Sequence, residues 1–542
     1  MINYFISLFH YKPIQLLTRF KLILFSRSKI NFSENKNFLY LKSNILLKFL
    51  EDSLDNNYVN NTIKKLKDGN ILFLGHFTAK IDSFFDNKIF INGDNLQKYE
   101  LSYLNFLTSL LFSKDKKLLE SIFDKLDKIY FEAKNLNVSH PFWYPYAVSC
   151  RLINVFIFIK IGESYDISKK KVDNIYQYMY WDYLYLKKNI EFDSDGNHLL
   201  KNYIALSIGS LVFEKNKFNY YYQQLIDTLH YQIIPDSGMH YEKSIDYHNS
   251  ILYDLYILYT ITQNNNIDNE HLERFISDMS HFSMLFHRKE KILINDTFEN
   301  YHFSEKKFLD ALSSIKNETV PTHTFPFAIF NTDNNMEMIL YYSDIHPRHC
   351  PAHLHDAIST YELWIDEKKF ITDSGNLDYN NTDKRIYYRS SHAHNISTSL
   401  GTSQSVLIKP FRFGKRSKII SVDSRQDLLE ISFAEVKNLF QYNKIKRKIL
   451  KNNNSIVVQD QTLQQNSKSY IHLDPKVQIL EKDSNMYILE KEGEKLFLRI
   501  NSPIIESSII TTHFSDKFYK ESTKKTIVLV FDNELEYNYT YE

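Results

Sequence analysis

The chain has 542 residues, of which 43% are hydrophobic and 24% are charged; this composition is typical of a globular protein with more than one core and excludes a disordered chain. Lysine and arginine number 66 against 65 for aspartate and glutamate, so the net charge of +1 gives no general attraction to nucleic acid or to anionic lipid. An acidic substrate would therefore have to meet a local positive site.

The cysteine count and the lengths of the apolar runs exclude further classes of protein. Cys150 and Cys350 are the two cysteines, too few for a disulfide framework or for a zinc module built on thiolates. No run reaches the ~18 uncharged apolar residues of a membrane span. Residues 1–10 and 14–25 are apolar, but two basic residues interrupt the second run and no small-residue cleavage site follows, so we expect no classical signal peptide. A helix packed on its own domain is the common outcome for such a segment, and a surface helix that touches a membrane or a partner is the alternative.

Up to about residue 315 the apolar residues follow a helical spacing. Each run places apolar side chains at i, i+3 and i+4 over several turns, and short polar loops join successive runs, which predicts stacked helical hairpins. The predicted helices cover residues 101–111, 118–129, 147–161, 172–186, 198–213, 220–233 and 251–261.

The first polar cluster in this helical part surrounds Trp143. It lies between prolines and aromatic residues and precedes a helix on which Arg151 and Asn154, three residues apart, share one face. Either a substrate cleft or a helix-capping or interdomain contact accounts for these residues.

The second cluster contains Asn197, His198 and Asn202 at the start of a predicted helix. There Asn197 and His198 would lie at the positive end of the helix dipole, where an anion is favoured. Capping alone explains Asn197, but it does not explain His198 and Asn202, which lie one turn apart on one face.

The third cluster is the dense polar segment 235–248, which contains Glu242 and Tyr247 and precedes an apolar helix. Tyr247 would fall in the first turn of that helix. It would lie near Asn197 and His198 if adjacent hairpins pack side by side.

From about residue 325 the apolar period changes to two, and the turns become rich in asparagine and aspartate, which predicts an antiparallel β-sandwich. Helices followed by strands indicate two domains, and the segment 316–327, with Pro321 and Pro326, is the natural linker. We therefore predict a helical domain over residues 1–320 and a sandwich over 321–542. The predicted strands cover residues 327–330, 336–342, 359–365, 369–372, 405–408, 418–422, 428–433, 447–450, 455–459 and 526–531.

Four polar residues of this second part indicate a metal site. Side chains at i and i+2 of a strand point to the same face, so His353 and His355 would project together, and Asp373 and His394 could converge from neighbouring strands. Two imidazoles and a carboxylate are standard zinc ligands, and a spare imidazole beside them indicates chemistry.

Taken together, these motifs resemble the heparinase II/III and alginate-lyase superfamily of polysaccharide lyases over roughly residues 95–415. The matching motifs, in the family's order, are Trp143…Pro145…Arg151…Asn154, Asn197-His198-Leu199…Asn202, Pro235-Asp236…Glu242…Ser244…Tyr247-His248, His353-x-His355-Asp356-Ala357, Asp373-Ser374-Gly375 and Tyr388-Arg389-Ser390…His394-Asn395. The resemblance implies an incomplete α/α toroid followed by an antiparallel β-sandwich, in agreement with the periodicity. It also implies a carbon–oxygen lyase that cleaves a uronic-acid-containing polysaccharide by β-elimination.

The resemblance further implies roles for single residues. It implies a zinc ion, mainly structural, on His355, Asp373 and His394. It implies that Asn197 and His198 neutralise the substrate carboxylate and that Tyr247 and His353 are catalytic. The residues expected to bind substrate are Trp143, Arg151, Asn154, Asn202, Glu242 and Arg389.

The expected partner is an acidic polysaccharide, with no nucleic acid, no transmembrane segment and a homo-oligomer left open. The family suggests the cell envelope or periplasm, and the missing classical signal peptide makes the cytoplasm the alternative. Two other functions stay open: a non-catalytic glycan-binding or surface-polysaccharide biosynthesis protein on the same scaffold, and a glycosidase that uses Asp236 and Glu242 as paired carboxylates. The presence of Asn197, His198 and Tyr247 together argues against an inactive site.

Overall fold

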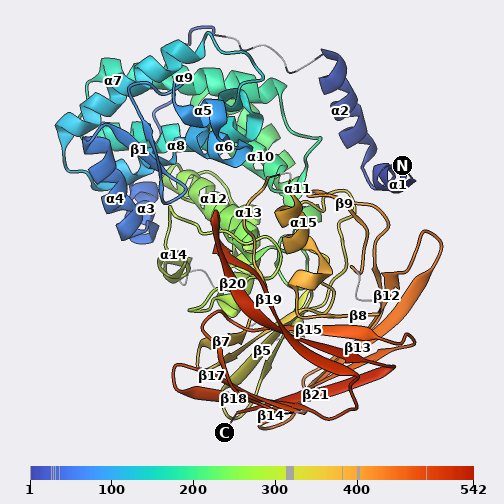
Figure 1. Ribbon diagram of the computed structural model, residues 1–542. Helices are drawn as coiled ribbons and strands as arrows, with labels where there is room; N and C mark the ends of the chain where they lie inside the picture. Colours follow the sequence, from blue (N-terminus) through green and yellow to red (C-terminus); the bar gives the residue numbers. More distant parts are fainter. Residues whose placement is uncertain are drawn as a thin grey trace.

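A computed structural model describes residues 2–25, 27, 30, 32–35, 37–312, 323–380, 382–399, 403–483 and 485–541 (Figure 1). An incomplete α/α toroid of helices is followed by antiparallel sheets that form a β-sandwich, as predicted. The helical part ends at α14 (Glu305–Leu312) and the first strand of the sandwich is β3 (His323–Thr324). The predicted boundary at residue 320, and most of the predicted linker, fall on residues 313–322, which lie outside the described residues.

Six of the seven predicted helices are confirmed, and one is interrupted. The spacing over 101–111 predicts one helix, but α6 ends at Tyr103 and a 3-10 helix follows, because Leu104 adopts a left-handed φ of 57° between them. The helices are α1 (Ile2–Leu8), α2 (Pro13–Phe25), α3 (Asn44–Ser53), α4 (Asn56–Lys67), α5 (Lys88–Asn92), α6 (Asn95–Tyr103), α7 (Lys116–Ala133), α8 (Pro145–Ser164), α9 (Lys169–Lys188), α10 (Gly196–Phe213), α11 (Phe218–Gln232), α12 (Ile245–Asn264), α13 (Glu270–Phe286), α14 and α15 (Asp383–Arg389).

Helix α8 is apolar on all sides because other helices of the toroid surround it. Leu152, Phe156 and Ile159 are each fully buried in it, and α6, α9 and α10 pack against it. Of the helices in the described ranges, α8 is the one whose length and hydropathy would suit a membrane span, and 89% of its most apolar window is buried inside the protein.

The described strands of the second part form four antiparallel sheets, and each of the ten predicted strands overlaps an observed one. Three of these sheets surround one core, and the fourth pairs β9 (Leu407–Lys409) with β10 (Arg412–Phe413). Nine described strands of the second part lie where the sequence predicted none: β3, β8, β10, β15 to β19 and β21. The first sheet has the order β3-β4-β5-β6-β7, the second β19-β20-β15-β8 and the third β11-β12-β13-β14-β21-β18-β17-β16. Their bounds are β4 (Phe327–Asn331), β5 (Met336–Tyr341), β6 (Tyr361–Ile365), β7 (Lys368–Ile371), β8 (Ser397–Thr398), β11 (Lys418–Arg425), β12 (Leu428–Val436), β13 (Tyr442–Lys451), β14 (Ser455–Thr462), β15 (Ser467–His472), β16 (Gln478–Lys482), β17 (Met486–Lys491), β18 (Glu494–Ile500), β19 (Glu506–Lys517), β20 (Lys520–Phe531) and β21 (Glu534–Tyr541).

The toroid and the sandwich share a small apolar core. Phe282 and Phe286 of α13 pack with Phe327 of β4 and Tyr341 of β5. Residues 287–304, between α13 and α14, continue from this core into the space between the two parts. This contact fixes the helices beside the loops of the sandwich, so a site built from both parts has defined walls.

Candidate active site

A cavity of about 820 Å³ lies between the toroid and the loops of the sandwich. Its walls come from helices α6, α8, α10 and α12 and from sandwich segments around residues 349–353, 379 and 409–412. The predicted site residues that line it are Asn197, His198, Glu242, Tyr247 and His353.

The N-terminus of α10 forms one wall, and Glu242 holds it in place. The Oε2 atom of Glu242 accepts a hydrogen bond from the backbone N–H of Asn197 at 3.0 Å. Gly196 has a φ of 56°, and a Cβ atom there would lie 2.8 Å from Oε1 of Glu242, so only glycine admits this carboxylate. Glu242 is almost fully buried and also accepts from Sγ of Cys350 at 3.2 Å. Its position supports the helix terminus on which Asn197 and His198 lie.

His198 is held by a buried carboxylate and an aromatic ring. Its Nδ1 lies 3.2 Å from Oε1 of Glu191, and its ring packs against Tyr146 with centroids 4.3 Å apart. Burial lowers the pKa of His198, but the nearby carboxylates of Glu191 and Glu242 outweigh it and raise the pKa above its ordinary value. Asn202 is fully buried and binds the backbone and side chain of Glu191, so it positions that carboxylate and does not reach the cavity.

Tyr247 of the toroid and His353 of the sandwich are in contact at the wall of the cavity. Their rings stack with centroids 3.7 Å apart at an interplanar angle of 29°, and the Tyr247 hydroxyl lies 2.7 Å from that of Tyr379. Burial, followed by the charge of Asp296, raises the pKa of Tyr247 well above its ordinary value of 10.0. The phenol therefore carries its proton at neutral pH.

Asp296, which the sequence did not single out, orders the histidines of the sandwich. It accepts from Nδ1 of His353 and from Nε2 of His355, both at 2.9 Å, and from Arg385 at 2.6 and 2.8 Å. Burial raises its pKa, but Arg385 and the two imidazoles outweigh burial and hold the pKa well below its ordinary range. A carboxylate can only accept, so Nδ1 of His353 carries a proton and Nε2 is left as the basic atom.

The expectation that His353 and His355 project together from a strand is wrong. Both lie in the loop between β5 and β6, and they bind different oxygens of Asp296, His353 through Nδ1 and His355 through Nε2. His353 lines the cavity, whereas His355 joins a separate cluster.

That cluster consists of His355, Asp373 and His394, whose candidate ligand atoms all lie within 4.8 Å of one another. All three side chains are buried, and Nδ1 of His355 and Nε2 of His394 have no hydrogen-bond partner among the described residues. His394 Nδ1 lies 2.8 Å from Oδ2 of Asp373. Two unpartnered buried imidazole nitrogens beside a carboxylate fit a divalent metal with the preferences of zinc.

The other residues expected to bind substrate lie inside the protein. Trp143 is fully buried and donates to the Ala133 carbonyl at 3.3 Å. Arg151 is fully buried in an ion pair of 2.7 Å with Asp182. Both side chains are bound inside the helical part, and neither lines the cavity.

Asn154 and Arg389 likewise have internal partners. Asn154 binds the Tyr103 carbonyl at 2.9 Å and lines a smaller cavity of about 80 Å³. Arg389 donates to the carbonyl oxygens of Leu354 and Pro410, and so ties together two loops that border the main cavity. None of these side chains lines the main cavity, so we assign them to the structure that supports it.

Comparison with known proteins agrees with this architecture. The family model for the heparinase II/III N-terminus matches residues 99–337, and that for the heparinase II/III-like C-terminal domain matches residues 324–539. The chain is similar to the crystal structure of heparinase III, with 15% identity, a TM-score of 0.65 and coverage of 83% of this chain and 77% of that one. It is similar to heparan sulfate lyase HepC from Pedobacter heparinus, with 15% identity, a TM-score of 0.55 and coverage of 97% and 87%. No curated protein sequence matches the chain.

Proposed function

The chain belongs to the heparinase II/III-like lyase superfamily, and from this premise we propose that it cleaves a uronic-acid-containing polysaccharide by β-elimination. The observation that carries the proposal is the convergence of Asn197, His198, Tyr247 and His353 on one cavity between the two parts of the protein. These residues supply an amide, an imidazole with a raised pKa, a protonated phenol and an oriented imidazole. β-Elimination from a uronate uses this combination of groups.

The first requirement is neutralisation of the uronate carboxylate. The proton on C5 of the sugar is only weakly acidic while the neighbouring carboxylate is charged. Asn197 and His198 lie at the N-terminus of α10, where the helix dipole favours an anion. Hydrogen bonds from the amide and from the protonated imidazole would stabilise the enolate-like charge that develops as the C5 proton leaves.

The second requirement is a base and an acid. In the proposed reaction Nε2 of His353, whose Nδ1 proton is held by Asp296, takes the C5 proton. The electron pair forms the C4–C5 double bond and expels the glycosidic oxygen from C4. Tyr247 donates its hydroxyl proton to that oxygen, and the adjacent Tyr379 hydroxyl offers a route to restore the proton on Tyr247.

Basic residues at the cavity favour an acidic substrate. Lys409 and Arg412 line the side formed by the sandwich, and Lys201 lines the side formed by α10. Lys201 is paired with Asp254, whereas Lys409 is exposed. These cations lie beside the carboxylates of Glu100, Asp195 and Glu242, and they support the proposal that a local positive site binds an acidic substrate.

A bound metal would stabilise the structure and would take no part in the proton transfers. His355, Asp373 and His394 would hold zinc, which when bound would cross-link the segments that carry them. Asp296 connects this cluster to the cavity because it binds His355 and His353 at the same time. No proton transfer in the proposed reaction needs the metal.

The proposal is tested with a panel of uronate polymers that includes alginate, heparan sulfate, hyaluronan and a bacterial capsular uronate. We expect ultraviolet absorbance from the unsaturated uronate product to rise with at least one polymer. Binding of a polymer, measured by calorimetry, without any rise in absorbance would overturn the lyase assignment and favour a glycan-binding protein.

A further inference from the structure

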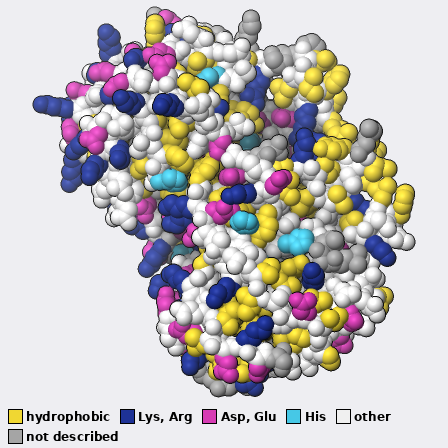
Figure 2. Space-filling model, in the orientation of Figure 1, with side chains coloured by type: hydrophobic (Ala, Val, Ile, Leu, Met, Phe, Trp, Pro, Cys, Tyr) yellow, Lys and Arg dark blue, Asp and Glu magenta, His cyan; other side chains and the backbone are white. Residues whose placement is uncertain are grey.

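Helices α1 and α2 expose many large apolar side chains. Eleven of the 29 large apolar side chains that are exposed in the described part of the chain lie within residues 2–24. Phe9 is 87% exposed, Ile23 80% and Leu17 65%. Figure 2 shows hydrophobic side chains gathered on the upper right of the molecule, where Figure 1 places α1 and α2. A contiguous apolar surface of this kind marks an interaction site.

Helix α2 lies with its polar side against its own protein. Gln15 is fully buried, and its Nε2 donates to the Asp193 carbonyl at 3.3 Å. Arg19 donates to the same carbonyl at 3.0 Å, and Lys12, just before the helix, pairs with Asp195 at 2.7 Å. These bonds fix the rotation of α2, so its apolar side faces solvent. A helix that serves only its own domain shows the reverse orientation.

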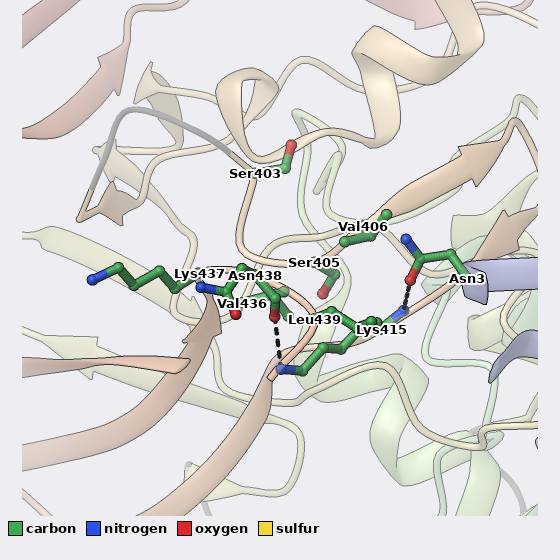
Figure 3. A pocket seen from close by; sticks show the side chains of 9 residues that line it. All are labelled: Asn3, Ser403, Ser405, Val406, Lys415, Val436, Lys437, Asn438 and Leu439. Carbon is green, nitrogen blue, oxygen red and sulfur yellow. Dashed lines mark hydrogen bonds between the residues drawn. The ribbon is translucent and has the colours of Figure 1, made fainter. Parts of the chain in front are cut away.

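Helix α1 is anchored in the same way. In Figure 3, Asn3 points into a hollow of the sandwich, where its Oδ1 accepts from the backbone N–H of Lys415 at 3.3 Å. A Cβ atom on Gly414 would lie 2.7 Å from Cβ of Asn3, so the Asn3 side chain packs directly on the backbone of Gly414. Ser7, one turn later, is also buried, whereas Phe5 and Phe9 are exposed.

The charge of this segment favours an anionic partner. The first 33 residues contain five lysines and arginines and no aspartate or glutamate. Lys21 is exposed within the apolar surface, and Arg348 and Lys409 of the sandwich are exposed nearby. Burial and the charges of Arg416 and Arg348 lower the pKa of His10, which lies between the two helices, to about 4.

We propose that α1 and α2 form a docking surface for an anionic lipid bilayer. Apolar side chains with basic residues around them are typical of helices that lie in a membrane interface, and anionic headgroups would complement the cations. A second copy of the chain fits less well, because two copies of this surface would bring like charges together without an acidic residue from either segment.

Docking would place the candidate active site beside the membrane. Tyr11 and Arg19 line the main cavity, so the segment that contacts lipid also borders the cavity. Resting on the proposed function, this arrangement favours a polysaccharide held near a membrane as the substrate.

The test is co-sedimentation of the full-length protein with vesicles of phosphatidylcholine alone or with about 30 mol% phosphatidylglycerol. We expect binding to the mixed vesicles, at least tenfold weaker binding to phosphatidylcholine alone, and loss of binding as salt rises. The variant Leu17→Ser/Phe20→Ser/Ile23→Ser changes exposed side chains on α2 and should reduce binding at least tenfold. The matched control Ile505→Ser/Ile509→Ser/Ile510→Ser changes exposed side chains around β19 and should bind as the wild type does.

Two outcomes would overturn the proposal. One is equal binding of the α2 variant and the wild type, or no binding by either. The other is a wild-type dimer in light scattering that the α2 variant loses, which would identify a second copy as the occupant. Turnover of a soluble polymer should be unchanged in the α2 variant, and vesicle binding should be unchanged in Tyr247→Phe. A failure of the docking proposal can therefore be distinguished from a failure of the proposed function.

Discussion

Oδ2 of Asp296 accepts a hydrogen bond from Nδ1 of His353 at 2.9 Å, although 57 residues separate them in the sequence. The other oxygen of the same carboxylate accepts from Nε2 of His355, also at 2.9 Å. One buried carboxylate thus sets the tautomer of a histidine in the cavity and of a histidine in the candidate metal cluster. The two parts of the site are coupled through Asp296.

Asp296→Asn tests this coupling. An amide can accept with one atom only, so one imidazole loses its fixed tautomer, and the buried Arg385 loses its counter-charge. We expect kcat/KM to fall by about 10²-fold or more and zinc affinity to fall by about 10–100-fold. Kinetics on the responsive polymer and a competitive zinc titration measure the two effects. Asp227→Asn, at an exposed position on α11, is the matched control. Unchanged kinetics in Asp296→Asn would refute the orienting role.

Tyr247→Phe removes the proposed acid and keeps the ring that stacks on His353. We expect kcat to fall by about 10²–10⁴-fold, with little change in KM or melting temperature, because only the proton donor is lost. Steady-state kinetics and a melting curve check this expectation. Tyr220→Phe, at a residue 59% exposed on α11, should behave as the wild type does. A variant that retains most of its kcat would remove Tyr247 from the reaction.

Local patterns were sufficient to predict most of the architecture. The helical spacing of 147–161 predicted most of α8 because a buried helix must present apolar residues at every turn. Strands β16 and β19 were missed because they bury few side chains: β19 carries mostly partly or fully exposed side chains and β16 is almost wholly exposed. A half-exposed strand lacks the apolar period that marks a strand in the sequence. Strands β17, β18 and β21 were missed although the burial of their side chains alternates.

The site was predicted less completely because it depends on contacts between distant residues. Asn197, His198 and Tyr247 could be singled out because polar residues at the start of an apolar helix need an explanation, and the family resemblance supplied their proposed roles. Asp296 and Arg385 lie 89 residues apart, and no spacing rule connects them. The one local signal was Asn295-Asp296 directly after the apolar run 292–294. The burial of Arg151 could not be predicted from the sequence either, because its partner Asp182 lies on the next helix.

His198 predicts a pH dependence. Its pKa is raised, so the imidazole stays protonated to a higher pH than usual and loses its proton as pH rises through that pKa. Since only the cation neutralises the substrate carboxylate, kcat/KM should fall on the alkaline side. Glu191→Gln removes the carboxylate beside His198 and should move this fall to lower pH.

The measurement is a pH profile of kcat/KM for the wild type and Glu191→Gln. Glu481→Gln, at an exposed position on β16, should reproduce the wild-type profile. An alkaline limb at the same pH in Glu191→Gln would show that another group controls it.

Arg151→Ala tests the role of the buried ion pair in the helical part. The change leaves the fully buried Asp182 without its counter-charge, which costs about 3–5 kcal/mol in the free energy of unfolding. Arg274→Ala breaks the exposed pair with Glu270, and it should cost under about 1 kcal/mol. Urea denaturation of both variants measures the difference. Similar losses in the two would contradict a structural role for Arg151.

The candidate metal cluster predicts a measurable zinc content. His355 precedes β6, Asp373 follows β7 and His394 precedes β8, so one ion would cross-link three segments of the sandwich. Elemental analysis of protein purified without chelator should find about one zinc per chain, and His394→Ala should lose it. His271→Ala, at an exposed position on α13, should keep it.

Chelation should lower the melting temperature of the wild type but not of His394→Ala, because a structural ion stabilises only the form that binds it. Absence of zinc from the wild type, or equal zinc in wild type and His394→Ala, would exclude these residues as ligands.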